Sequence, residues 1–422
     1  MDFRDVTDTL FTWIFVGALV ASTCLRLWLA RRQIVHVRAH RDAVPHDFAE
    51  VISLSAHQKA ADYTVEKSRL GALDLLIDAG ILLILTLGGL LQWISDQWEQ
   101  VFAPSGIAHG VALIISVTLL LSALDLPTSL YRTFVVEARF GFNRMTWSLF
   151  VADLARQGLV GAILGVPLVV LVLWLMAAMG ELWWLYVWGA WTIFNLLMLV
   201  AYPTLIAPLF NKFTPLEDAE LAQRVDALLA RCGFRSKGLY VMDGSRRSSH
   251  GNAYFTGFGT AKRIVFFDTL LARLAPREIE AVLAHELGHF NRHHVWKRIG
   301  LLFSFSAVLL WALGQLIDQS WFYGGLGVQT QSTASALLLF VLVSGAFTFF
   351  LQPIASLYSR KHEYEADAYA ARFSSEGSLV KALVKLYQDN ASTLTPDPLY
   401  SAFYDSHPPA AARVARLHGA AA

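Results

Sequence analysis

Long apolar stretches separated by short polar segments dominate the pattern of this chain. A helix needs about 20 consecutive, mostly apolar residues to cross the hydrocarbon core of a bilayer. Stretches of this kind occur at 9–30, 71–94, 107–126, 158–180, 183–206, 299–317 and 333–355. The pattern therefore predicts an all-α polytopic membrane protein whose seven transmembrane helices carry a small α+β unit between the fifth and sixth spans.

The composition agrees with this prediction. Of 422 residues, 55% are hydrophobic and only 16% are charged, which is more apolar than an ordinary soluble protein. A net charge of +1 gives no indication of nucleic-acid binding, so the expected partner is the lipid bilayer. With only Cys24 and Cys232, the chain has no disulfide framework.

Cationic side chains predict the orientation in the membrane. They cluster in the segment after the first span (31–70) and in the segment after the third, whereas the connections 95–106, 181–182 and 318–331 contain no Lys or Arg. The positive-inside rule then places the N-terminus outside and the C-terminus in the cytoplasm. Acidic Asp2 and Asp5 precede the first span, which favours a retained anchor over a cleaved signal peptide.

The spans and polar segments divide the chain into four parts. Residues 1–206 form a five-span membrane region, 207–298 a cytoplasmic α+β part, 299–355 the last two spans, and 356–422 a C-terminal cytoplasmic part. In the second part, "FTPLEDAELAQRVDALLARCGF" predicts a helix and "GLYVMDGS" a strand. "NAYFTG" and "RIVFFD" predict two strands around the turn "FGTAK", and a further helix begins near Pro276.

The stretch "AVLAHELGHFNRHHVW" at 281–296 carries the candidate chemistry. His285 and His289 are four residues apart, so on a helix both imidazoles lie on one face and can bind one Zn²⁺. Glu286 lies beside them, where a carboxylate can take a proton from water and pass it to a leaving amine. The alternative is a surface helix that carries two histidines by chance.

A catalytic zinc usually has three protein ligands. His293 continues the helical series, but about 12 Å of helix separates its backbone from that of His285, so a basic helix end formed by His293 and His294 is the preferred interpretation. The better candidate for the third ligand is Glu363 in "SRKHEYEADAYA". Because the last two spans form a hairpin, Glu363 returns to the membrane face at which His285 and His289 lie. Asp367, one turn further on, can fix the tautomer of a ligand histidine. The alternative for this helix is a solvated charged face.

Ordered motifs along nearly the whole chain resemble the type I CAAX prenyl endopeptidases, which are seven-span zinc metalloproteases. The motifs are "KSRLG", "EARFGFNRMT", "YPTLIAPLFNKFTPL", "DGSRRSSHGNAYFTGF", "KRIVFFDTLL", "HELGH", "EYEAD" and "SHPPAAARVARL". The resemblance implies a zincin-like unit, a large water-filled chamber within the helix bundle and one Zn²⁺ per chain. His285, His289 and Glu363 match the zinc ligands, and Glu286 matches the catalytic glutamate.

Further roles come from the resemblance alone. The segment of Asn252, Ala253 and Tyr254 matches the edge strand that binds the substrate backbone. His407 and Arg413 match positions near the active site, where His407 is expected to help hold the oxyanion and Arg413 to bind substrate. The alternatives are that Asn252 only adjoins a turn and that His407, which precedes two prolines, only packs there.

The resulting expectation is a zinc metalloendopeptidase that hydrolyses peptide bonds. Relatives in the family remove the C-terminal tripeptide from prenylated CAAX proteins, whereas a quality-control protease for membrane proteins without prenyl specificity is the alternative. An Ala- and Arg-rich, Lys-poor composition favours a bacterial inner membrane over the endoplasmic reticulum. A non-enzyme alternative is a transporter or a scaffold with a structural zinc, but a structural zinc does not require Glu286, and no inverted repeat is evident.

Carboxylates inside the predicted spans are a separate feature. Asp74 and Asp78 lie in the second span, and intramembrane carboxylates normally face an interior or a water-filled cavity. For Asp74, pairing with Arg69 or another interfacial cation is the simpler interpretation.

Overall fold

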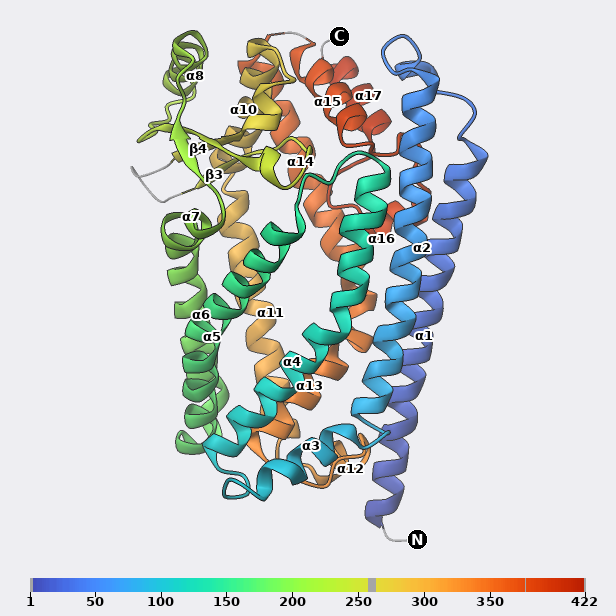
Figure 1. Ribbon diagram of the computed structural model, residues 1–422, viewed down its shortest axis with the longest axis vertical. Helices are drawn as coiled ribbons and strands as arrows, with labels where there is room; N and C mark the ends of the chain where they lie inside the picture. The colour runs from blue at the N-terminus through green and yellow to red at the C-terminus, as the bar shows by residue number, and fades with distance from the viewer. Residues whose placement is uncertain (1–2, 257–262, 376, 421–422) are drawn as a thin grey trace.

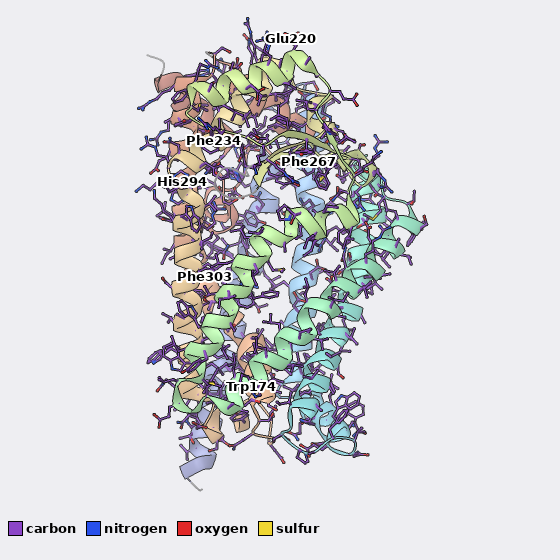
Figure 2. The ribbon with its side chains drawn as sticks, turned by 90° about the vertical axis from the view of Figure 1, so that its left-hand side faces the viewer. Trp174, Glu220, Phe234, Phe267, His294 and Phe303 are labelled. Atoms are coloured by element: carbon purple, nitrogen blue, oxygen red, sulfur yellow. The ribbon has the colours of Figure 1, made fainter. Side chains whose placement is uncertain are left out.

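Long helices run along the molecule and carry a small α+β unit at one end (Figure 1). The computed structural model describes residues 3–256, 263–375 and 377–420. The N-terminus lies at the opposite end from the sheet and the C-terminus (Figure 1). The side-chain view places Glu220 near the sheet end and Trp174 near the other (Figure 2). The long helices are α1 (Phe3–Ala39), α2 (Leu54–Leu85), α4 (Ile107–Tyr131), α5 (Trp147–Ala178), α6 (Trp183–Ala201), α11 (His294–Leu316), α13 (Thr333–Thr348) and α14 (Gln352–Phe373).

The spans predicted from hydropathy are confirmed in number and order. Within the described part of the chain, six helical segments are long and apolar enough to cross a membrane, and a bent pair makes a seventh. That pair is α2 with α3 (Leu90–Glu99), which meet at 49°. The predicted span 71–94 was wrong in its second half, because the helix ends at Leu85 and Gly89 takes a left-handed φ of 75° that turns the chain.

A continuous apolar core fills the end of the bundle near the N-terminus. There α3 and the short α12 (Ser320–Gly324) lie across the ends of the long helices (Figure 1). Phe15, Leu85, Leu113, Phe322 and Leu339 are buried completely or nearly so in this core. Burial of large side chains from several helices fixes their relative positions, at about 1.5–3 kcal/mol for each side chain removed from solvent.

The α+β unit contains a four-stranded sheet with the order β1-β2-β4-β3. The strands are β1 (Phe213–Pro215), β2 (Leu239–Met242), β3 (Ala253–Thr256) and β4 (Arg263–Phe267). Only β2 and β4 are parallel. Because β3 pairs with β4 alone among the described strands, its other edge is free.

The sequence predictions for this unit are largely confirmed. Strands β2, β3 and β4 form as expected, whereas β1 was missed because it covers three residues ahead of the helix predicted to begin there. That helix is α8 (Ala219–Arg231), which Asp218 caps by accepting a hydrogen bond from the Leu221 N–H. The predicted turn "FGTAK" falls on residues 258–262 and lies outside the described residues.

Shorter helices complete the fold around the sheet and the C-terminal part. They are α7 (Ala207–Phe210), α9 (Asp268–Leu271), α10 (Pro276–Asn291), α15 (Ser378–Asp389), α16 (Pro398–Tyr404) and α17 (Ala410–Ala420). Short 3-10 segments (η1 His46–Phe48, η3 Gly180–Leu182, η5 Gly244–Arg246, η6 Phe349–Leu351) and π-helical segments (η2 Arg132–Glu137, η4 Tyr202–Ile206) lie between these elements, η5 between β2 and β3.

Helices α10 and α14 pack closely against each other over a buried apolar seam. Ala284, Leu287 and Ala370 are completely buried in this seam. Gly288 lies at the closest approach, since a β-carbon there would be 2.9 Å from the Ala366 Cα and 3.0 Å from the Tyr369 Cβ. The contact therefore requires a residue without a side chain at position 288.

We predict that Gly288→Ala destabilises the protein, because the added methyl group meets backbone atoms that cannot move aside. Overpacking of this kind costs about 1–3 kcal/mol. The matched control is Gly300→Ala on α11, where a β-carbon meets nothing within 4 Å. Thermal unfolding of both variants in detergent is the measurement. Equal unfolding temperatures would contradict the proposed close contact.

Candidate active site

A cavity of about 990 Å³ joins the α+β unit to the membrane helices. His285 and Glu286 of α10 line it on one side, and Arg26 of α1 and Asp78 of α2 line it on the other. Its position agrees with the chamber that the sequence resemblance implied. Because the cavity extends between helices long enough to span a bilayer, it connects the candidate chemistry with the membrane region.

The intramembrane carboxylates of α2 have different environments. Asp74 lies 2.7 Å from Arg132, so an interfacial cation does neutralise it, although the partner is not Arg69. Asp78 lines the cavity, as expected for a carboxylate within a span.

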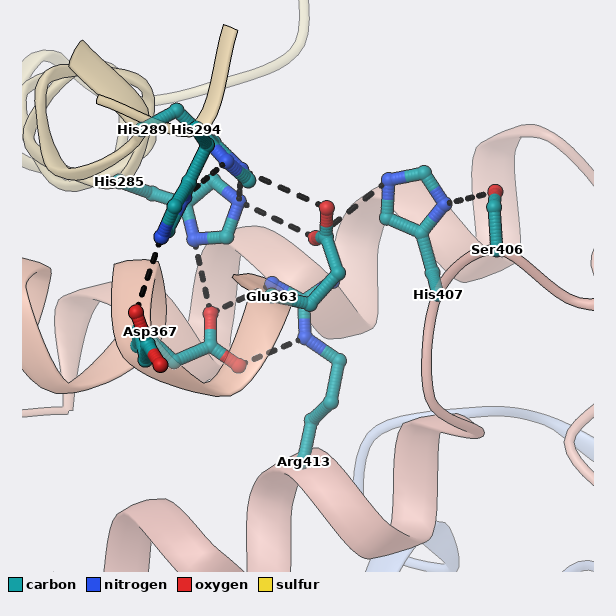
Figure 3. A network of polar contacts seen from close by, with 9 residues as sticks. His285, His289, His294, Glu363, Asp367, Ser406, His407 and Arg413 are labelled. Carbon is teal, nitrogen blue, oxygen red and sulfur yellow. Dashed lines mark hydrogen bonds and ion pairs between the residues drawn. The ribbon is translucent and has the colours of Figure 1, made fainter. Parts of the chain in front are cut away.

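Three potential ligand atoms converge where α10 meets α14 (Figure 3). The Nε2 atoms of His285 and His289 are 3.3 Å apart, and each lies 3.4 Å from an oxygen of Glu363. Bonds of about 2.05 Å in a tetrahedral zinc site place neighbouring ligand atoms about 3.35 Å apart. The three side chains therefore fit a tetrahedral metal ion such as Zn²⁺, as the spacing of the histidines and Glu363 predicted.

The carboxylates beside the two histidines favour a positive charge at His285. Burial alone would lower the pKa of His285, but hydrogen bonds to Asp367 and Glu363 outweigh burial and raise this pKa to about 9. Burial and the neighbouring charge of His285 lower the pKa of His289 to about 3. One histidine thus holds a proton between carboxylates where a cation would bind.

Asp367, one turn after Glu363 on α14, contacts His285. Its Oδ1 lies 2.8 Å from the His285 Nδ1. Arg413, which comes from α17, donates two hydrogen bonds of 2.6 and 2.8 Å to the same carboxylate, and both side chains are buried. No pattern in the sequence indicated this ion pair. The substrate contact expected for Arg413 stays a prediction, since its guanidinium is directed at Asp367 (Figure 3).

His407 and Glu286 face the cavity beside the ligand atoms. The His407 Nε2 lies 3.4 Å from Glu363, and its Nδ1 lies 3.0 Å from the Ser406 hydroxyl. Partial desolvation at the cavity wall lowers the pKa of His407, which favours the neutral ring, although 60% of its side chain remains accessible to solvent. Burial also raises the pKa of Glu286, whose carboxylate has no ion-pair or hydrogen-bond partner among the described residues. Glu286 is therefore free to contact a reactant.

The edge strand β3 adjoins the same cavity. Asn252 and Ala253 line it, whereas Tyr254 packs its ring edge-on against Phe267, with the centroids 6.2 Å apart. The Asn252 side chain accepts a hydrogen bond from the Ala253 N–H. The free edge of β3 thus lies beside the ligand cluster, where an extended peptide could pair with it.

The interpretation of His293 and His294 as one basic helix end was wrong for His294. His293 is exposed, but His294 is only 1% exposed and lies 3.0 Å from both His289 and Glu365. His293 ends the helix by taking a left-handed φ of 57°, and the next residue turns back to the site. The sequence feature that could have indicated this role is the position of His294, five residues after His289.

Comparisons with known proteins match both halves of the chain. Residues 33–212 match the family model described as CAAX prenyl protease N-terminal, five membrane helices. Residues 215–421 match the model of peptidase family M48.

Similar proteins cover nearly the whole length. A CAAX prenyl protease 1 homolog of Arabidopsis thaliana is 34% identical over 421 residues, which are 96% of each chain. A probable CAAX prenyl protease 1 of Schizosaccharomyces pombe is 32% identical and covers 94% of this chain and 87% of its own. The crystal structure of S. mikatae Ste24p matches with a TM-score of 0.89 at 30% identity, and the match covers 96% of this chain and 99% of that one.

We predict that His285→Ala, His289→Ala and Glu363→Ala each lose the bound metal, because two remaining ligands hold an ion poorly. The controls are His293→Asn and Glu217→Gln, which change exposed side chains of the same types. Elemental analysis of the purified variants gives the metal content. Full metal content in the Glu363 variant would show that a different side chain is the third ligand.

Proposed function

The chain belongs to peptidase family M48 with the membrane domain of the CAAX prenyl proteases, and from this membership we propose that it is a zinc enzyme that removes the C-terminal tripeptide from prenylated CAAX proteins. It is an integral-membrane metalloendopeptidase. The observation that carries the proposal is the convergence of three ligand atoms at the wall of a cavity that reaches between the membrane helices.

Zinc is the ion that this ligand set suits best. Two imidazoles and one carboxylate are a common set for a catalytic zinc, with the fourth position left open. Zinc supplies a Lewis acid that polarises the scissile carbonyl. His285, His289 and Glu363 would hold the ion, and Asp367 with Arg413 would keep His285 in the tautomer that presents Nε2 to it.

Glu286 is the proposed general base. Its unpaired carboxylate lines the cavity next to His285, and its raised pKa makes it better suited to take a proton from the attacking water and return it to the leaving amine. The neutral His407 can accept a hydrogen bond from Ser406 at Nδ1, which leaves an N–H at Nε2. That N–H would stabilise the oxyanion of the tetrahedral intermediate.

The free edge of β3 is the proposed binding site for the substrate backbone. A peptide added to this edge would be ordered by main-chain hydrogen bonds and would pass along Asn252 and Ala253 toward Glu286. The cavity wall also continues onto the membrane helices α1 and α2.

The site is proposed to face the cytoplasm of a bacterial cell, with the protein in the inner membrane and its N-terminus outside. The orientation is supported by the Lys and Arg residues of the segments on the sheet side and by their absence from 95–106 and 318–331. The bacterial assignment rests on the Ala- and Arg-rich composition.

We predict that the purified protein cleaves a farnesylated CAAX peptide directly after the modified cysteine and releases a tripeptide. Mass spectrometry of the products, with an unmodified peptide in parallel, is the test. Glu286→Gln should retain the metal but lower turnover at least about 10²-fold, because the general base is lost. Cleavage of both peptides at many positions would instead favour the quality-control protease, and near-normal turnover of Glu286→Gln would exclude this base.

We predict opposite labelling of two introduced cysteines on intact cells. Gln329→Cys and Lys237→Cys, both at exposed positions, are made in a chain in which Cys24 and Cys232 are replaced. An impermeant thiol reagent should label position 329 but not 237. Labelling of 237 alone would invert the orientation, and equal labelling of both in sealed cells would refute an odd number of crossings between them.

A further inference from the structure

We infer that His294 is a positioning residue that couples the proposed metal ligand His289 to the Glu365 carboxylate. The inference rests on the proposed function only in that His289 binds the metal through Nε2. Of the three proposed ligands, His294 forms a hydrogen bond with His289.

Two short contacts define the arrangement (Figure 3). The His294 Nδ1 lies 3.0 Å from the His289 Nδ1, and the His294 Nε2 lies 3.0 Å from the Glu365 Oε2. The ring of His294 is almost fully buried. Each of its two nitrogens therefore has one polar partner, and water has little access to either.

If His289 binds a metal through Nε2, the two contacts determine which ring nitrogens of His289 and His294 carry a proton. His289 then carries its proton on Nδ1 and donates it to the His294 Nδ1, which must be the acceptor. A neutral His294 carries its proton on Nε2 and donates it to Glu365. Every group is satisfied with neutral rings, so the relay fixes both the tautomer and the ring orientation of His289.

Each of the two proposed ligand histidines thus has a supporting carboxylate on the same helix, α14. His285 contacts Asp367 directly, whereas His289 reaches Glu365 through His294. Both carboxylates lie on α14, within two residues or one turn of Glu363. An additional imidazole, that of His294, therefore lies between ligand and carboxylate at His289 but not at His285.

The break between α10 and α11 is what makes the contact possible. In an unbroken helix, residue 294 would be rotated by about 140° from residue 289. The left-handed conformation of His293 ends α10, and α11 restarts at His294. Non-glycine residues in this region cluster at functional sites. The ring of His294 is then held flat against His362 of α14, with the centroids 4.0 Å apart and the planes at 10°.

The experiment measures zinc affinity of the purified full-length protein by competition with a chromogenic chelator. His294→Phe keeps a flat ring that can stack on His362 but removes both ring nitrogens. We expect it to weaken zinc binding about 10- to 100-fold, the usual effect of losing the partner of a ligand histidine. His294→Asn offers an amide oxygen near the place of Nδ1 and should restore part of the affinity. His293→Asn is the matched control and should bind as the unchanged protein does.

Variants of Glu365 provide a second, independent test in the same experiment. Glu365→Ala should weaken zinc binding, and the double variant Glu365→Ala, His294→Phe should bind no more weakly than His294→Phe alone, because Glu365 acts only through His294. Additive losses, or a His294→Phe affinity within twofold of the unchanged protein, would overturn the inference. If the phenylalanine variant does not fold, the Glu365→Ala and His294→Asn affinities decide in the same way. Failure of the unchanged protein to bind zinc would refute the proposed function instead.

Discussion

The close packing of α10 on α14 is the contact on which the rest of the site depends. Each helix alone offers only part of a metal site, since α10 carries two histidines and α14 one carboxylate ligand. Ligand atoms within 3.4 Å of one another require the two backbones to approach as closely as Gly288 and Ala366 allow. The hairpin of α11 and α13 returns the chain to this contact after crossing the membrane region and back.

Charge at this contact explains why the site needs a cation. Glu363 and Asp367 are buried beside the cavity that Glu286 lines, and Arg413 is the single fixed cation that forms an ion pair with either of the two buried carboxylates among the described residues. Buried charges are stable only when they are paired or bind a metal. Hydrogen bonds to Asp367 and Glu363 raise the pKa of His285, which shows that this contact favours a positive charge.

The membrane helices also position the segment that carries His407. Arg32 of α1 donates two hydrogen bonds to Asp397, which is buried and caps α16 by accepting from the N–H groups of Leu399 and Tyr400. Since α16 leads directly to His407, the membrane helix α1 holds the segment that presents this histidine to the cavity. The membrane bundle is therefore part of the active site and not only its anchor.

The sequence by itself determined the spans, the strands β2 to β4 and the helical pair His285 and His289, because each depends on local periodicity or on spacing within one helix. The prediction that Glu363 lies beside α10 followed from the even number of spans, two, between the segments 207–298 and 356–422. The ion pair of Arg413 with Asp367, the place of His294 and the end of α2 at Leu85 depended on the tertiary structure. They arise from contacts between segments distant in sequence or from a single residue with left-handed backbone, and neither leaves a periodic signal in the chain.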